Sequence, residues 1–295
     1  MSDQISTAYA RKYAAGIELL AQQMKSVTES TVRVESGVGS EAVFLDQVGV
    51  VRMQEKSGSA VNIPVINTPH ARRMVTPRDF YMRDFIDAFD RLKIFNDPQN
   101  AYTEAFVAAG QRQKDKLVID AALGTAYTGK QGTTAVTLPA GQAIAAGGTG
   151  FTFAKVQEAI RILRNANAIM QGEEVTCLYT SFQEKEFLNQ TEVKSFDYNT
   201  QKALVEGEAG TFYTVRFKRV EDIAADADGR MLPWASSTRS CVMYAKQGVA
   251  LVKWKDVYGR LAWLDEREAW QVMAGLSAGA TRMQETKVVK IDCVE

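Results

Sequence analysis

The stretch VVRMQEKSGSAVNIPVINTPHARRMVTPRDF, residues 50–80, decides how the rest of the chain is interpreted. Its centre, residues 55–59, is polar and contains glycine, while the flanks 50–53 and 61–66 are rich in β-prone residues. This pattern predicts a long β-hairpin with its tip near Lys56. A two-stranded ribbon with so few large apolar residues is marginal alone in water, so we expect it to lie on another surface, such as another chain.

The chain before the hairpin predicts a helical arm followed by extended chain. Residues 32–51 consist of short apolar pieces broken by glycines, which is typical of extended chain. Closer to the N-terminus, an apolar stripe repeats every three to four residues, as in an amphipathic helix. The stripe is formed by Ile5, Tyr9, Tyr13, Ile17, Leu20 and Met24. It either packs on its own domain or lies on a neighbouring subunit.

After the hairpin, a long helix is predicted over residues 98–123. Asp97 is a suitable N-cap, Pro98 occupies the first helical position, and Gly124 is a suitable C-cap. No proline interrupts the segment, which is rich in good helix formers. At 1.5 Å per residue the helix would be about 39 Å long, enough to act as the spine of a flat domain.

The remaining chain alternates predicted strands and helices. A turn-rich insert, 124–150, is predicted to hold two short strands, 135–138 and 142–145, which flank Pro139. Two helices are predicted next, at 153–165 with Thr152 as the cap and at 181–189 with Ser181 as the cap, and a strand at 175–179 lies between them. Further strands are predicted at 211–220, 240–244 and 249–254. The last residues, 270–295, are predicted to form two strands joined near 275–279. The fold class is therefore mixed α and β.

Composition excludes several classes of protein. The 295 residues suffice for about two domains, and 35 Lys+Arg balance 35 Asp+Glu, which argues against a basic nucleic-acid coat and against an acidic tail. A hydrophobic share of 46% excludes general disorder. Three scattered cysteines argue against a disulfide framework, and the single histidine, His70, excludes a metal site with several imidazoles. Without a long apolar run or a signal-peptide pattern, we expect a soluble intracellular product.

The motifs that suggest chemistry have simpler structural interpretations. The segment Gly124–Lys130 matches a phosphate-binding loop, but Gln131 stands where Ser or Thr should bind Mg²⁺, and a helix precedes the loop. We therefore interpret it as a turn. The aspartates at 79, 84, 87 and 90 alternate with arginines at 78, 83 and 91, a pattern that favours a charged face or subunit contact over acid/base or Mg²⁺ chemistry. Arg72 and Arg73 are too few for a nucleic-acid footprint.

No catalytic, cofactor-binding or metal-binding residue is predicted. The candidate residues are instead assembly contacts, taken from the arm stripe, the hairpin and the charged run after it. They are Ile5, Tyr9, Tyr13, Ile17, Leu20, Met24, Lys56, Arg72, Arg73, Asp84, Asp87 and Asp90.

Five stretches carry a family resemblance. They are RVESGVGSEAVFLDQVG (33–49), INTPHARRMVTPRDF (66–80), DFIDAFDRLKIFNDPQNAYTEA (84–105), residues 121–163, and TEVKSFDYNTQKALVEGE (191–208). In these stretches, which cover most of the chain, the sequence resembles the major capsid proteins of tailed bacteriophages with the α+β Hong Kong phage capsid fold. The similarity is greatest to the short-tailed branch of phage epsilon-fifteen and the Bordetella phage.

The resemblance implies a domain layout and a function. It implies an N-terminal arm at 1–45 and an extended hairpin loop at 46–78. A peripheral domain would follow at 79–150, with the spine helix 98–123 and the hairpin insert, and then an axial α/β domain at 151–262. Residues 263–295 would be return strands of the peripheral domain. Pentamers and hexamers would form an icosahedral shell around double-stranded DNA, assembled in the host cytoplasm and found in the virion.

The resemblance also implies partners. The chain would bind itself, a portal and cement proteins. Because the arm begins near residue 1, the resemblance implies either a separate scaffold protein or no scaffold. DNA would be contacted weakly and without sequence specificity, and no membrane is involved. No cofactor and no covalent cross-link is expected, although Lys56 is the one lysine near the hairpin tip. Two alternatives stay open: an encapsulin-like shell that loads enzymes, and a nucleotide-binding enzyme that uses Gly124–Lys130.

Overall fold

The computed structural model shows a mixed α and β chain that divides into two compact units. The structure describes residues 23–56, 58–59, 65–87, 99–169, 172–190, 211–212, 214–224 and 229–295. Unit 1 contains 1–25, 79–112 and 256–276, and unit 2 contains 26–78, 113–255 and 277–295. Each unit is therefore built from segments that are far apart in the sequence, and four long elements (α2, β4, β13 and β14) pass from one unit to the other.

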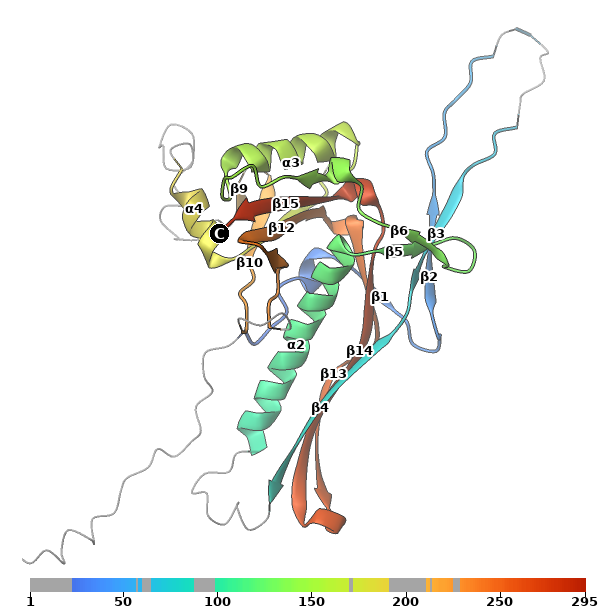
Figure 1. Ribbon diagram of the computed structural model, residues 1–295. Helices are drawn as coiled ribbons and strands as arrows, with labels where there is room; N and C mark the ends of the chain where they lie inside the picture. Colours follow the sequence, from blue (N-terminus) through green and yellow to red (C-terminus); the bar gives the residue numbers. More distant parts are fainter. Residues whose placement is uncertain are drawn as a thin grey trace, which may run out of the picture. The chain divides into compact units, whose positions relative to one another are not determined.

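The largest sheet has seven strands and lies in unit 2 (Figure 1). Its order is β7 (Ala143–Ile144), β15 (Val288–Val294), β12 (Thr238–Ala245), β8 (Val175–Tyr179), β10 (Val215–Arg219) and β9 (Thr211–Phe212), with β11 (Trp234–Ala235) paired to β12. Strand β12 is antiparallel to both neighbours, β15 and β8, whereas β10 and β8 are parallel. All five residues of β8 are buried, as its continuous apolar sequence predicts.

Two helices accompany this sheet, and both were predicted. Helix α3 (Phe153–Asn165) begins after Thr152, whose hydroxyl accepts a hydrogen bond from the Lys155 amide, and its apolar face is buried as expected. Helix α4 (Ser181–Leu188) also lies where predicted, but its N-cap is Thr180 and not Ser181. The Thr180 side chain and Gln183 form a capping box, a pairing that the sequence Thr-x-x-Gln allows at this position.

A second sheet of unit 2 holds the hairpin. Its order is β2 (Val43–Val48), β3 (His70–Val75), β5 (Ala126–Thr128) and β6 (Thr134–Val136), with all neighbours antiparallel. The flank 50–53, predicted to be extended in the hairpin, forms no strand, and residues 61–64 of the other flank lie outside the described residues. The ladder runs from Val43 opposite Val75 to Val48 opposite His70. The ladder forms where other parts of the chain cover the strands, whereas β-prone residues further out have no cover.

The insert between α2 and α3 contains both predicted short strands. The one expected at 135–138 is β6 (Thr134–Val136), which pairs with β5, and the one expected at 142–145 is β7 (Ala143–Ile144), which pairs with β15 in parallel. Between them lies a short 3-10 helix, Ala140–Gln142. The β5–β6 turn uses Gly129 and Gly132, both with positive φ, a conformation that costs glycine little. Lys130 lies in this turn, in agreement with the interpretation of Gly124–Lys130 as a turn.

The predicted spine helix is present as α2 (Gln99–Leu123), while Asp97 and Pro98 lie outside the described residues. Within unit 1, glycines allow close packing between α2 and a long strand. A Cβ atom on Gly110 would lie 2.7 Å from a methyl group of Val257, and one on Gly259 would lie 3.0 Å from Thr103. Helix α2 and the strand that contains Val257 and Gly259 therefore approach each other closely at two positions along the helix.

A third sheet has the order β1 (Arg33–Ser36), β13 (Val249–Leu264), β14 (Ala269–Arg282) and β4 (Arg78–Asp87). Strand β13 continues ten residues beyond the predicted end at residue 254. The predicted break near 275–279 was wrong, because β14 runs through it and the next connection is at 283–287. Gly275 faces the Tyr258 ring, where a Cβ atom would lie 2.8 Å from the hydroxyl, so this glycine makes room for a side chain within the strand.

Candidate assembly surfaces

The base of the hairpin is fixed to the connection between β14 and β15. Gln47 on β2 and Arg73 on β3 both donate to the main-chain oxygen of Met283, at 2.8 and 3.0 Å. The Arg73 guanidinium also donates to both carboxylate oxygens of Glu285, at 2.9 and 2.8 Å. An apolar cluster of Leu45, Val75, Ala250, Val252 and Met283 lies beside these bonds. A buried charged pair together with apolar packing makes this base a rigid support.

A buried arginine at the end of β14 completes this support. Arg282 is fully buried, and its guanidinium donates to the carbonyl oxygens of Ala122 (3.0 Å), Gly124 (2.6 Å) and Val136 (3.0 Å). Gly124 follows the last residue of α2 as predicted, but its φ is not left-handed. The carbonyl groups at the helix end are satisfied by Arg282, whose positive charge also suits a helix C-terminus.

Beyond the base, the hairpin opens into two arms, residues 50–56 and 65–68 (Figure 1). The last bond between the two sides joins the Gly49 amide to the Pro69 oxygen, at 2.8 Å. Among the described residues of the arms, no backbone group bonds to another described residue. Exposed apolar side chains are concentrated here: Val50 is 91%, Val65 92% and Met53 fully exposed. Exposed apolar surface of this kind is typical of regions that bind other molecules.

The described chain begins close to a second anchor, on α2 in unit 2. The carboxylate of Asp115, which is fully buried, accepts four hydrogen bonds from three consecutive residues. The donors are the hydroxyls of Ser26 (2.6 Å) and Thr28 (2.7 Å) and the amides of Val27 and Thr28 (3.0 Å each). We call this arrangement the Asp115 clasp. It holds residues 26–28 against α2.

The next residues strengthen this anchor. Glu29 bridges two lysines, Lys114 at 2.8 Å and Lys253 at 2.6 Å. Burial alone would raise the pKa of Glu29, but hydrogen bonds and charge attraction from both lysines outweigh it and lower the pKa below its ordinary value. Two residues later, the hydroxyls of Thr31 and Tyr244 share a hydrogen bond of 2.7 Å, and β1 then pairs in parallel with β13.

The predicted assembly residues fall into different environments. Ile5, Tyr9, Tyr13, Ile17, Leu20 and Asp90 lie outside the described residues. Met24 is 44% exposed. Asp84 accepts a hydrogen bond from the amide of Phe85 at 2.8 Å, and Asp87 is the last residue of β4. The structure therefore does not bring the arm stripe and the aspartates together within the part of the chain that it describes.

The hairpin candidates also separate. Lys56 is exposed on an arm. Arg72 pairs with Asp46 at 3.0 Å, across the ladder, and its guanidinium lies 5.4 Å from the centre of the Phe44 ring. Arg73, its neighbour in sequence, points to the opposite side of the strand and anchors the hairpin base. Sequence reasoning missed Asp115, Arg282 and Glu285, because nothing local marks a buried charge whose partners are distant in the chain.

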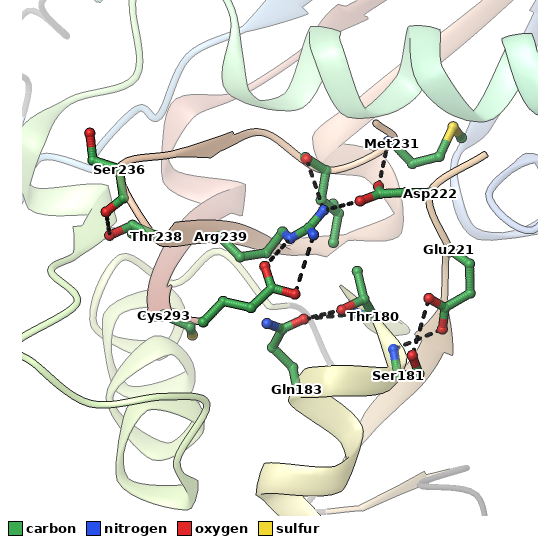
Figure 2. Close-up of polar contacts among 12 residues, drawn as sticks. Thr180, Ser181, Gln183, Glu221, Asp222, Met231, Ser236, Thr238, Arg239 and Cys293 are labelled. Atoms are coloured by element: carbon green, nitrogen blue, oxygen red, sulfur yellow. Dashed lines mark hydrogen bonds and ion pairs between the residues drawn. The ribbon is translucent and has the colours of Figure 1, made fainter. Parts of the chain in front are cut away.

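A dense cluster of polar side chains lies in unit 2 (Figure 2). Arg239, which is 7% exposed, pairs with Asp222 at 2.6 Å and with Glu295 at 2.9 Å. Burial would lower the pKa of Arg239, but the two carboxylates outweigh it and raise the pKa. Nearby, Thr180 and Gln183 bond to each other. The Arg239 guanidinium lies between the carboxylates of Asp222 and Glu295, so the cluster joins β12 to the chain on either side of it.

Other chemical signals are also absent from the described chain. No group of three or more metal-ligating side chains occurs among the described residues. The three cysteines are free and fully buried, and burial raises the pKa of the Cys177 thiol. Among the described helices, none is both long enough and apolar enough to cross a bilayer.

The comparison with protein families decides the identity. The family model for phage capsid proteins matches residues 5–295. The chain belongs to the phage capsid protein family. No curated protein matches this capsid protein. The family is one of structural proteins of the phage particle.

Solved capsid structures share the fold of this capsid protein. The head structure of the Helicobacter pylori bacteriophage KHP40 has a TM-score of 0.74 and 12% identity, over 99% of this chain and 98% of that chain. The acid-stable capsid of the Helicobacter pylori bacteriophage KHP30 has the same score and identity, over 100% and 98%. The capsid of the cyanophage P-SCSP1u has a TM-score of 0.70 and 16% identity, over 97% and 93%. The expected α+β Hong Kong phage capsid fold is confirmed.

Proposed function

We propose that this capsid protein assembles into pentamers and hexamers of an icosahedral shell that encloses double-stranded DNA. The observation that carries this proposal is the hairpin: its base is fixed by Arg73 and Glu285, while its arms expose apolar side chains that no described part of the same chain covers. A neighbouring copy is the surface that would cover them. Such a contact would offset the entropy lost when the arms become ordered.

The layout that accompanies this proposal assigns residues 1–45 to an arm and 46–78 to the extended loop. Residues 79–150 and 263–295 form the peripheral domain, and 151–262 form the axial domain. The chain would belong with the short-tailed phages of the epsilon-fifteen and Bordetella branch, which the stretches quoted above resemble. Assembly would take place in the host cytoplasm, with a portal, cement proteins and either a separate scaffold or none as further partners.

The test removes the exposed apolar groups without changing the hairpin base. The triple variant Val50→Ser, Met53→Ser and Val65→Ser should melt within about 2 °C of the natural protein, because these side chains contribute no burial to the free subunit. Electron microscopy should show no particles. The matched control is Ile223→Ser, a side chain that is 57% exposed outside the hairpin, and it should form normal particles. Normal particles from the triple variant would contradict the assembly role of the arms.

A second measurement concerns the contents of the shell. Particles isolated from phage-producing cells should contain double-stranded DNA that resists nuclease until the shell is opened. Particles filled with a protein cargo and no DNA would instead support the encapsulin-like alternative. Hydrogen exchange on free subunits and particles should show protection of amides in 50–56 only after assembly, and equal protection in both states would place the arms in an intramolecular core.

A further inference from the structure

Lys155 has an unusual environment for a lysine. It lies in the first turn of α3 and is 8% exposed. Its ammonium nitrogen is 2.9 Å from each of four main-chain carbonyl oxygens, those of Ala146, Thr149, Gly150 and Asp292. An ammonium group has three N–H donors, so at least one is shared between two oxygens. With the described residues Lys155 makes no ion pair.

General electrostatics makes this arrangement costly unless the oxygens compensate. A buried lysine is normally paired with a carboxylate, and a positive charge in the first turn of a helix opposes the helix dipole. Here the hydrogen bonds of the ammonium group go to four neutral carbonyl oxygens, and the nearby Glu186 carboxylate accepts from the Phe151 amide at 2.8 Å. A ring of main-chain carbonyl oxygens is also what proteins use to replace the hydration shell of potassium. The four oxygens around Lys155 therefore have the chemistry of a site for a monovalent cation.

The local sequence explains how three of the oxygens converge. In the loop 146–150, Gly147 and Gly148 have φ of 58° and 70°, and the Thr149 amide bonds to the Ala146 oxygen at 3.0 Å. Two consecutive left-handed residues curl the chain, which only glycine does without strain. The Val294 amide donates to the Thr149 oxygen at 3.0 Å, and this bond holds the loop beside β15, which supplies the fourth oxygen from Asp292.

We propose that these four oxygens form a monovalent-cation site that the chain fills with its own Lys155 ammonium group. Shortening the side chain should then open the site to a free cation of similar size, ammonium or potassium. Because the Lys155 ammonium group is covalently attached to the chain, it cannot dissociate from the four oxygens when the protein is diluted. The loop 146–150 stays fastened to β15 whatever the ionic composition around the protein. This proposal is independent of the assembly proposal.

The experiment compares Lys155→Ala with the natural protein in chloride salts at equal ionic strength. The natural protein should give the same thermal midpoint in ammonium, potassium, sodium and tetramethylammonium. The Ala variant should melt lower in tetramethylammonium, and ammonium or potassium should raise its midpoint in a saturable way, by about 3 °C at several times the dissociation constant. Tetramethylammonium is too large to enter and measures the general salt effect.

Two further variants control the result. Lys155→Met keeps the volume of the side chain but has no charge, so it should be destabilised and show no difference among the four cations. If Lys155→Ala is not recovered folded in sodium, the yield of refolding from urea is measured in ammonium against tetramethylammonium, and a higher yield in ammonium is expected. Identical responses of Lys155→Ala to ammonium and tetramethylammonium in both measurements would overturn the proposal.

Discussion

Asp115→Asn is the substitution for which the structure allows the most detailed prediction. The Asp115 clasp uses one carboxylate oxygen for the Ser26 hydroxyl and for the amide and hydroxyl of Thr28, and the other oxygen for the Val27 amide. An asparagine that keeps the first oxygen must place its NH₂ group against the Val27 amide. Two donors then face each other in a buried position, and the remaining three bonds lose the negative charge that strengthens them.

The magnitude follows from the bonds that are lost or weakened. A hydrogen bond to a charged group contributes about 1.5–3 kcal/mol, and a buried donor left without an acceptor costs about 1–3 kcal/mol. We therefore expect Asp115→Asn to lower the free energy of unfolding by about 3 kcal/mol, and Asp115→Ala to lower it further because all four bonds disappear. Against a total of about 5–15 kcal/mol for a native protein, this loss is large.

The assay is urea unfolding of the purified subunit, followed by tryptophan fluorescence and circular dichroism. The control is Asp120→Asn, on the exposed side of the same helix, which should change the unfolding free energy by less than about 0.5 kcal/mol. Hydrogen exchange should also show faster exchange of the Val27 and Thr28 amides in Asp115→Asn. An unchanged urea midpoint for Asp115→Asn would refute the view that the clasp holds residues 26–28 in place.

Further predictions concern Glu29, the N-terminal residues 1–25, the cysteine thiols and Lys130. Because the pKa of Glu29 is lower in the folded than in the unfolded state, its bridge to two lysines stabilises fully above the unfolded value of 4.5 and is lost as the pH falls through the folded pKa. The stability difference between Glu29→Gln and the natural protein should therefore shrink on acidification, and a constant difference in acid titrations would contradict this. Deleting residues 1–25 keeps the Asp115 clasp, so it should leave a folded subunit that forms fewer particles in electron micrographs; normal particles would show the arm to be dispensable. A thiol reagent should not react with the buried cysteines until urea unfolds the protein, whereas reaction in the native state would show that the sheet opens. Lys130→Ala should assemble normally, and a magnesium-dependent nucleotide binding lost in this variant would revive the enzyme alternative.

Local signals in the sequence predicted the local elements well. Thr152 precedes an apolar face of helical spacing, and the segment 98–123 contains good helix formers without proline, so α3 and α2 were found almost to the residue. The capping residue of α4 was misplaced by one position because Thr180 and Ser181 are both good caps. In each case the deciding interaction lies within one or two helical turns.

The features that were not predicted from the sequence depend on interactions between segments that are far apart in the chain. The hairpin ladder ends at Val48 and His70 because only its base is covered by Met283 and its neighbours. Gly275 resembles a turn residue in sequence, yet it makes room for the Tyr258 ring inside a strand. The site around Lys155 consists of main-chain oxygens. Every residue type has a main-chain oxygen, so the residue types in the sequence do not indicate such a site. Its one local signal is a lysine in the first turn of a helix, where an acidic residue is more usual.

The fixed base of the hairpin has a consequence for the order of events during synthesis. Strands β2 and β3 leave the ribosome early, but they are held by Met283 and Glu285, which are made much later. Strand β1 likewise waits for residues 250–253, its parallel partner. Contacts between such distant segments form slowly and only once both are available. A growing chain therefore cannot hold the base of the hairpin in position before its C-terminal residues are made. If the arms contact a neighbouring copy, as proposed above, subunits would associate only after they have folded.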